Sequence, residues 1–152
     1  MALKRVVVTG LGALTPIGNN LNDFWTGLIE GKSGAAPITY FDTEKFKTKF
    51  ACELKDFDIS LHLDRKQQRK MDRFTQYGMV STDEAIQDSG LDLEKIDKLR
   101  VGVIWGSGIG GIETFQNQML DHASGDGTPR FNPFFIPKMI ADITPVSYTH
   151  LT

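Results

Sequence analysis

The chain has 152 residues, of which 40% are hydrophobic and 24% charged, and its formal net charge at pH 7 is −2. This balance is typical of a soluble folded protein, and it excludes a disordered chain and a general attraction for nucleic acid or anionic membranes. Neither a run of roughly 18 apolar residues nor a signal-peptide pattern is present, and the single cysteine, Cys52, excludes internal disulfides and indicates a reducing cytoplasm.

The first elements predicted are a strand and a helix joined by glycines. Residues 6–8 are three valines, an apolar run typical of a strand that is buried on both faces. Residues 19–34 begin with two asparagines, continue with apolar residues at helical spacing, and reach Gly31. This order predicts a helix with an asparagine cap at its start and a glycine stop at its end.

The middle of the chain predicts a half-buried strand and one long helix. Residues 50–55 alternate between apolar and polar side chains, with Cys52 on the apolar face. Residues 64–89 have an apolar stripe at helical spacing, and Gly90 follows as a stop signal.

The last third repeats the opening order of a strand, glycines and a helix. Residues 101–105 precede a second glycine loop, residues 112–123 have helical spacing, and residues 131–143 are apolar and interrupted by prolines. Alternation of strands and helices predicts an α/β chain with a mostly parallel sheet.

Glycines follow both predicted strands, 6–8 and 101–105, as they do in dinucleotide-binding sites. The fingerprint of such a site needs three glycines at fixed spacing between a strand and a helix. In the first loop Gly10 and Gly12 fit, but Thr15 occupies the third position. In the second loop the spacing fits, but the acid expected about 20 residues later, Asp126, lies in a loop with no strand before it. The glycines are therefore expected to permit close packing and positive φ, and no nucleotide cofactor is predicted.

Three longer motifs carry a family resemblance: RVVVTGLGALTPIGNN, RKQQRKMDRFTQYG and GVIWGSGIGGIETF followed by PRFNPFFIP. In this order they resemble the N-terminal part of the β-ketoacyl-[acyl-carrier-protein] synthases, of the type II kind that elongates fatty acids in bacteria. The resemblance runs from residue 4 to about residue 145. It implies a thiolase-like layered α/β/α fold, of which only part of the first half is present here.

The resemblance also implies the reaction, a decarboxylative Claisen condensation of malonyl-acyl-carrier protein with an acyl thioester. The partners implied are acyl- and malonyl-loaded carrier protein and a second copy of the enzyme, with no cofactor and no metal. In the family the nucleophilic cysteine and two histidines lie beyond the part that this chain resembles. No catalytic residue is therefore expected here, and the fragment itself is expected to be inactive.

Cys52 is not assigned the role of the missing nucleophile. It stands in the alternating segment 50–55, where a cysteine is expected to be a small buried hydrophobe. His62 and His122 are expected in a loop and near a helix end, and the three histidines and one cysteine have no metal-ligand spacing.

Residues 65–73 hold five of the 17 basic residues, and four of them recur at helical spacing. By composition this is a solvated helix face. The resemblance assigns Lys66, Arg69 and Lys70 to docking of the acidic carrier protein. It also assigns Ile109 to the gate of the acyl pocket, and Phe134 to the acyl pocket of the partner subunit.

Residues 1–145 are expected to form the N-terminal part of the synthase domain, and the last seven residues, 146–152, resemble a translated sequencing adapter and are expected to be non-native. Two alternatives remain: a nucleotide-binding oxidoreductase domain and a non-catalytic binding or scaffold domain. Uncovered sheet edges and apolar faces are expected to make the fragment prone to aggregation.

Overall fold

The structure is a computed structural model, and it describes residues 3–151. The chain divides into two compact units, one of residues 3–57 with 81–91 and the other of residues 58–80 with 92–151. Helix α3 (Arg73–Ser89) contributes its first half to the second unit and its second half to the first unit. No helix of residues 3–151 is long and apolar enough to cross a membrane.

The first unit contains helix α1 (Leu21–Ile29) at the place the sequence predicts. The side chain of Asn20 accepts a hydrogen bond from the backbone N–H of Asp23, which satisfies one of the free donors at the helix start. Gly31 follows the helix with φ +65°, a left-handed conformation that glycine adopts without strain. Both predicted boundary signals are therefore confirmed.

A two-stranded antiparallel sheet completes the first unit. Strand β1 (Ala36–Pro37) pairs with β2 (Phe50–Ala51), with Ala36 opposite Ala51 and Pro37 opposite Phe50. The predicted half-buried strand 50–55 is thus two residues long. Cys52 lies beyond it and is exposed, so its prediction as a buried residue was wrong. Alternation creates a buried face only where another layer covers it, and the short β1 supplies no such layer.

The predicted strands before the two glycine loops do not form. Residues 6–8 and 101–105 carry no strand pairing, and Val6 and Ile104 are 89% and 98% exposed. A strand needs a neighbour for its backbone hydrogen bonds, and none is present beside either segment among residues 3–151. The mostly parallel sheet expected from the sequence is therefore absent from the part of the chain that the structure describes.

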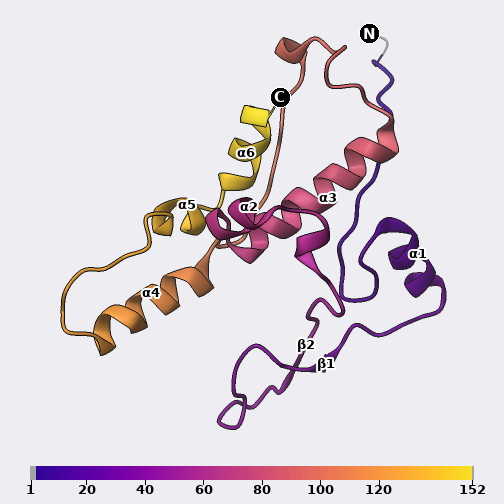
Figure 1. Ribbon diagram of the computed structural model, residues 1–152. Helices are drawn as coiled ribbons and strands as arrows, with labels where there is room; N and C mark the ends of the chain where they lie inside the picture. Colours follow the sequence, from indigo (N-terminus) through magenta and orange to yellow (C-terminus); the bar gives the residue numbers. More distant parts are fainter. Residues whose placement is uncertain (1–2, 152) are drawn as a thin grey trace. The chain divides into compact units, whose positions relative to one another are not determined.

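The second unit is helical (Figure 1). Helices α4 (Ile112–Ser124) and α5 (Phe135–Met139) contact each other, joined by a loop. The remaining elements are η1 (Ile59–Leu61), α2 (Arg65–Lys70), η2 (Lys98–Arg100) and α6 (Ile143–Leu151). Side chains from α3, from α6 and from the link between η1 and α2 form the core of the unit: Leu63, Thr75, Met79, Val80, Thr144 and Tyr148.

The long helix expected over residues 64–89 is broken into α2 and α3. Met71 has an extended conformation with φ −115° and ψ 143°. The side chain of Gln76 donates to the carbonyls of Gln68 and Met71, which satisfies acceptors that the break leaves free. Gly90 ends α3 with φ +64°, as predicted.

Residues 146–151 of the segment expected to be non-native form most of α6, and Thr152 lies outside the described residues. Tyr148 is 5% exposed and its hydroxyl donates to the carbonyl of Met79 over 2.8 Å. The expectation that residues 146–152 are not native stays a prediction.

Candidate functional site

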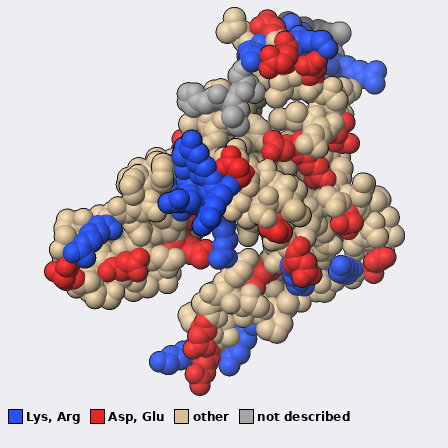
Figure 2. All heavy atoms as spheres, viewed as in Figure 1, with Lys and Arg blue, Asp and Glu red and all other residues tan. Residues whose placement is uncertain are grey.

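A basic groove lies on helix α2 in the second unit. It has a volume of about 450 Å³ and is lined by Arg65, Lys66, Arg69, Lys70 and Phe134. Figure 2 shows lysine and arginine side chains gathered over α2. No carboxylate belongs to the lining, so the groove combines four positive charges with one aromatic ring. The structure therefore brings the three predicted docking residues together with Phe134.

Local sequence fixes the groove's basic wall. Asp64 caps α2 by accepting from the N–H of Gln67, whose side chain accepts from the N–H of Asp64 in return. This capping box begins the helix one residue before Arg65. Arg69 and Lys70 then fall in the last turn, where cations interact favourably with the helix dipole. The four cations are therefore held on one short, capped helix.

Phe134 supplies the groove's aromatic side. Its backbone N–H donates to the side chain of Asn132 over 2.8 Å, and the N–H of Asn132 donates to Gln118 on α4 over 2.7 Å. The Lys70 ammonium lies 5.8 Å from the centre of the Phe134 ring, within the range of a cation–π contact. The ring is half-buried and keeps part of its apolar surface accessible.

Arg73, expected on the same helix face, belongs to α3 instead. Its guanidinium lies 3.4 Å from the carboxylate of Glu113 on α4, and both side chains are substantially exposed. Beside this pair the hydroxyl of Thr114 donates to the carboxylate of Asp72. The break in the predicted helix thus separates Arg73 from the groove. Asp72 and Arg73, at the α2–α3 junction, instead contact the first turn of α4.

Ile109 lies on the exposed loop before α4 and is 73% exposed. The following residue, Gly110, has φ +90°, and a Cβ there would lie 2.5 Å from the carbonyl oxygen of Met139. The N–H of Gly111 donates to the same carbonyl over 3.2 Å. Directly after Ile109 the loop is therefore held against the last residue of α5. Only glycine fits this close contact between the two backbones.

The first glycine loop is held by carboxylates of α3, in the first unit. A Cβ on Gly12 would lie 1.9 Å from the carbonyl oxygen of Ser81, so the loop packs directly on the helix backbone. The N–H of Leu11 donates to Asp88 over 2.9 Å, and the N–H of Ala13 donates to Glu84 over 2.8 Å. Backbone donors of this kind bind phosphate in nucleotide sites. Because carboxylates already occupy these two, the loop is a packing element, as the spacing predicts.

Sequence reasoning missed the role of Glu84. Its second carboxylate oxygen accepts from the N–H of Leu21 over 2.7 Å, so one side chain joins the glycine loop to the start of α1. The available signal was a pair of acids, Glu84 and Asp88, four residues apart on one helix face.

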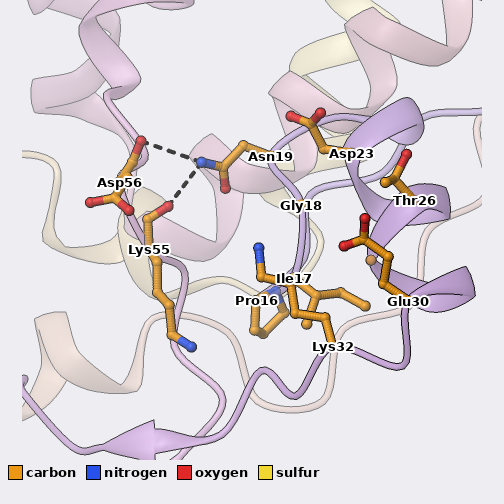
Figure 3. A pocket seen from close by; sticks show the side chains of 11 residues that line it. Pro16, Ile17, Gly18, Asn19, Asp23, Thr26, Glu30, Lys32, Lys55 and Asp56 are labelled. Atoms are coloured by element: carbon orange, nitrogen blue, oxygen red, sulfur yellow. Dashed lines mark hydrogen bonds between the residues drawn. The ribbon is translucent and has the colours of Figure 1, made fainter.

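The first unit also contains a pocket of about 290 Å³ (Figure 3). Asn19 forms its edge by donating to the carbonyls of Lys55 and Asp56 over 2.8 and 3.3 Å. The charged side chains of its lining are Asp23, Glu30, Lys32, Lys55 and Asp56, of both signs, and the lining has no cysteine or histidine. It has therefore no group of the kind that forms a thioester.

No metal site is found within residues 3–151. No three histidine, cysteine or acidic side chains gather there to hold a metal ion. Cys52, the one cysteine of the sequence, is exposed. His62 is the residue that caps the end of η1. His122 lies in the last turn of α4, and its exposed ring lies 5.4 Å from the ring of Phe131.

Three carboxyl groups outside the groove have a lowered pKa. Hydrogen bonds from Ser60 lower the pKa of Asp58, a hydrogen bond from Lys95 lowers that of Asp92, and hydrogen bonds from Thr128 lower that of Asp126. All three carboxylates accept hydrogen bonds from nearby residues in exposed caps and turns, so local structure explains these pKa shifts.

Comparisons with known proteins agree with the motifs. A family model described as "Beta-ketoacyl synthase, N-terminal domain" matches residues 3–149. The chain is 46% identical over 143 residues to a protein named 3-oxoacyl-[acyl-carrier-protein] synthase 2 from Staphylococcus aureus (strain COL), covering 92% of this chain and 34% of that protein. A protein of the same name from Synechocystis sp. is also 46% identical, with 92% and 33% covered. The chain thus spans about a third of the length of these relatives.

Solved structures show the same fold. The ishigamide ketosynthase/chain length factor has a TM-score of 0.79 and 27% identity, covering 98% of this chain and 37% of that one. A complex of a type II PKS acyl-carrier protein with its ketosynthase has a TM-score of 0.77 and 25% identity, covering 95% of this chain and 38% of that one. The chain is therefore part of a thiolase-like α/β fold, of which residues 3–151 form helices and one short antiparallel sheet.

Proposed function

The chain belongs to the β-ketoacyl synthase family, and we propose that it is the N-terminal part of a 3-oxoacyl-[acyl-carrier-protein] synthase that elongates fatty acids. The observation that carries this proposal is 46% identity over 143 residues to proteins of that name. The part proposed is residues 1–145, with residues 146–152 outside the native sequence. A read of the same genomic locus tests the boundary, because a stop codon directly after Thr152 contradicts it.

The reaction proposed for the complete synthase forms one carbon–carbon bond. A cysteine thiolate accepts the acyl group from its carrier, malonyl-carrier protein loses CO₂, and the resulting carbanion attacks the acyl thioester and expels the thiolate. A thiolate suits both steps because it is a strong nucleophile and a good leaving group. No residue of the described chain is assigned to this chemistry. The fragment is expected to bind carrier protein without turnover.

The reaction is tested with purified complete protein, acyl-carrier protein and malonyl-carrier protein. The expected products are a 3-oxoacyl-carrier protein two carbons longer and one CO₂. Binding of a nicotinamide cofactor with hydride transfer, and no condensation, would support the oxidoreductase alternative instead. The single cysteine of the chain supports a reducing, cytoplasmic site for this reaction.

Carrier docking is proposed for Lys66, Arg69 and Lys70. All three are exposed and line one groove that contains no carboxylate, which suits an acidic partner. The variant K66E/R69E/K70E of the complete synthase is expected to bind carrier protein much more weakly, with the largest loss at low salt. The matched control K45E/K47E/K49E changes the net charge equally at exposed lysines of the other unit. Unchanged affinity of the first variant at low salt contradicts the proposal.

Ile109 is proposed as the gate of the acyl pocket, on the family resemblance. Ile109 is the one β-branched side chain among the glycines of this anchored loop. The rotamer of its side chain would therefore decide whether an alkyl chain can enter. Ile109→Phe is expected to lower turnover of long acyl substrates more than that of short ones. Equal activity across chain lengths contradicts this role.

A homodimer is proposed for the complete synthase. The segment before and within α5 exposes apolar side chains, including Phe131 and Ile136, which are 40% and 53% exposed. Apolar and aromatic residues of this kind are typical of subunit interfaces. Light scattering of the complete protein tests the assembly, and a monomer at micromolar concentration contradicts it.

A further inference from the structure

The loop that carries Ile109 is held on one side of this residue. A Cβ on Gly106 or on Gly108 would have no atom of another described segment within 4 Å, so the stretch before Ile109 lies in open space. The stretch after it is enclosed. Gly111 is buried, and a Cβ there would lie 2.2 Å from the carbonyl oxygen of Lys138. The position of Ile109 therefore depends on the groups that hold Gly111.

One of these groups is a carboxylate from the α2–α3 junction. The Oδ2 atom of Asp72 lies 3.0 Å from the place that a Cβ of Gly111 would take, and it accepts a hydrogen bond from the hydroxyl of Thr114 in the first turn of α4. Gly111 is the residue before α4 and has no side chain to cap the helix. Asp72 supplies an acceptor and a negative charge at this helix start, where the helix dipole favours an anion.

Asp72 is itself fixed by the residues around it. Its carbonyl accepts from the N–H of Gln76 over 3.1 Å, which is the first hydrogen bond of α3. The side chain of Gln76 donates to the carbonyls of Gln68 and Met71, so the residue before Asp72 is tied as well. The side chains of Asp72 and Thr114 are partly buried. A contact between groups that are held in this way is preorganised and costs little entropy to keep.

We propose that Asp72 positions the loop of Ile109 and thereby sets how sharply the complete synthase discriminates between acyl chain lengths. The inference rests on the gate role proposed for Ile109. The Asp72 carboxylate binds Thr114 and lies against Gly111, which keeps the start of α4 and the end of the loop in one place. Loss of this contact lets Ile109 take more positions, so the gate discriminates less between long and short chains. Asp72 is a positioning residue, because it acts through Gly111 and the Ile109 side chain.

The test measures kcat/KM of the complete synthase with long-chain and short-chain acyl-carrier protein. Asp72→Ala and Thr114→Val each remove the contact, and each is expected to move the long-to-short ratio about threefold toward one. The double variant is expected to shift the ratio no further, because both changes remove the same contact. Thr114→Ser keeps the hydroxyl and is expected to keep the ratio of the unmodified protein. Asp126→Ala, which removes an exposed carboxylate of the same unit, is the matched control.

A second measurement follows the loop directly and does not depend on the gate. The N–H of Gly111 donates to the carbonyl of Met139, so its hydrogen exchange reports opening of the loop end. Asp72→Ala is expected to speed this exchange about tenfold, the effect of a lost hydrogen bond to a charged group. Asp72→Asn keeps an acceptor oxygen without the charge and is expected to have a smaller effect. Thr114→Val tests the same contact if neither variant of Asp72 folds.

The outcomes separate the inference from the gate proposal. Unchanged exchange at Gly111 in Asp72→Ala overturns the positioning role, whatever the role of Ile109. Faster exchange with an unchanged long-to-short ratio, where Ile109→Phe does change that ratio, overturns the link between Asp72 and specificity. If Ile109→Phe also leaves the ratio unchanged, the gate proposal fails and the inference fails with it. An equal shift of the ratio in Asp126→Ala contradicts the inference too, because the effect would then not be specific to the contact with Thr114.

Discussion

Replacing Glu84 tests whether the first glycine loop is a packing element. Its two carboxylate oxygens accept from the N–H groups of Ala13 and Leu21 over 2.8 and 2.7 Å, both at partly buried sites. A hydrogen bond to a charged group contributes about 1.5–3 kcal/mol, and partial exposure favours the lower end. Glu84→Ala is therefore expected to destabilise the loop by about 3 kcal/mol. Glu84→Gln keeps one acceptor oxygen and is expected to lose about half of this.

The assay is hydrogen exchange at the amides of Ala13 and Leu21. A loss of about 3 kcal/mol corresponds to roughly a hundredfold faster exchange by local opening. Glu44→Ala, at an exposed glutamate of the same unit, is the control and is expected to leave both amides unchanged. Unchanged exchange in Glu84→Ala refutes the reasoning. Protection of the loop amides by added nucleotide would refute it in another way, because it would restore the phosphate-binding alternative.

Further predictions concern packing, the α2–α3 junction and pH. Gly12→Ala places a Cβ 1.9 Å from a backbone carbonyl oxygen of α3 and is expected to destabilise the protein by about 3 kcal/mol in urea unfolding, whereas Gly102→Ala, in open space, is expected to be nearly neutral. Thr114→Val removes the donor to Asp72 and is expected to cost about 1–2 kcal/mol in the same assay. Hydrogen bonds lower the pKa of Asp126 below 3.8, so its contribution to stability is present above that pH and lost as pH falls through the folded-state pKa. An NMR titration midpoint at or above 3.8 contradicts this.

Local signals in the sequence predicted both ends of α1, the end of α3 and the family. Asn20 and Gly31 enclose α1, and Gly90 ends α3, because capping and positive φ depend on the nearest few residues. The spacing of the first glycines also argued locally against a dinucleotide site. The close packing of Gly12 on α3 and the hydrogen bond from Ala13 to Glu84 agree with a loop that packs on a helix. The three residues proposed for carrier docking, Lys66, Arg69 and Lys70, lie within five positions of the sequence, so one short helix places them together.

Contacts between distant segments were decided only by the tertiary structure. The sequence predicts strands at residues 6–8 and 101–105, but a strand forms only beside a partner, and within residues 3–151 neither segment has one. Exposure of Cys52 follows from the same absence of a covering layer. Phe134 reaches the groove of α2 from a segment more than sixty residues away, through a turn fixed by Asn132. Local propensity gives the elements, whereas long-range hydrogen bonds and packing decide which of them meet.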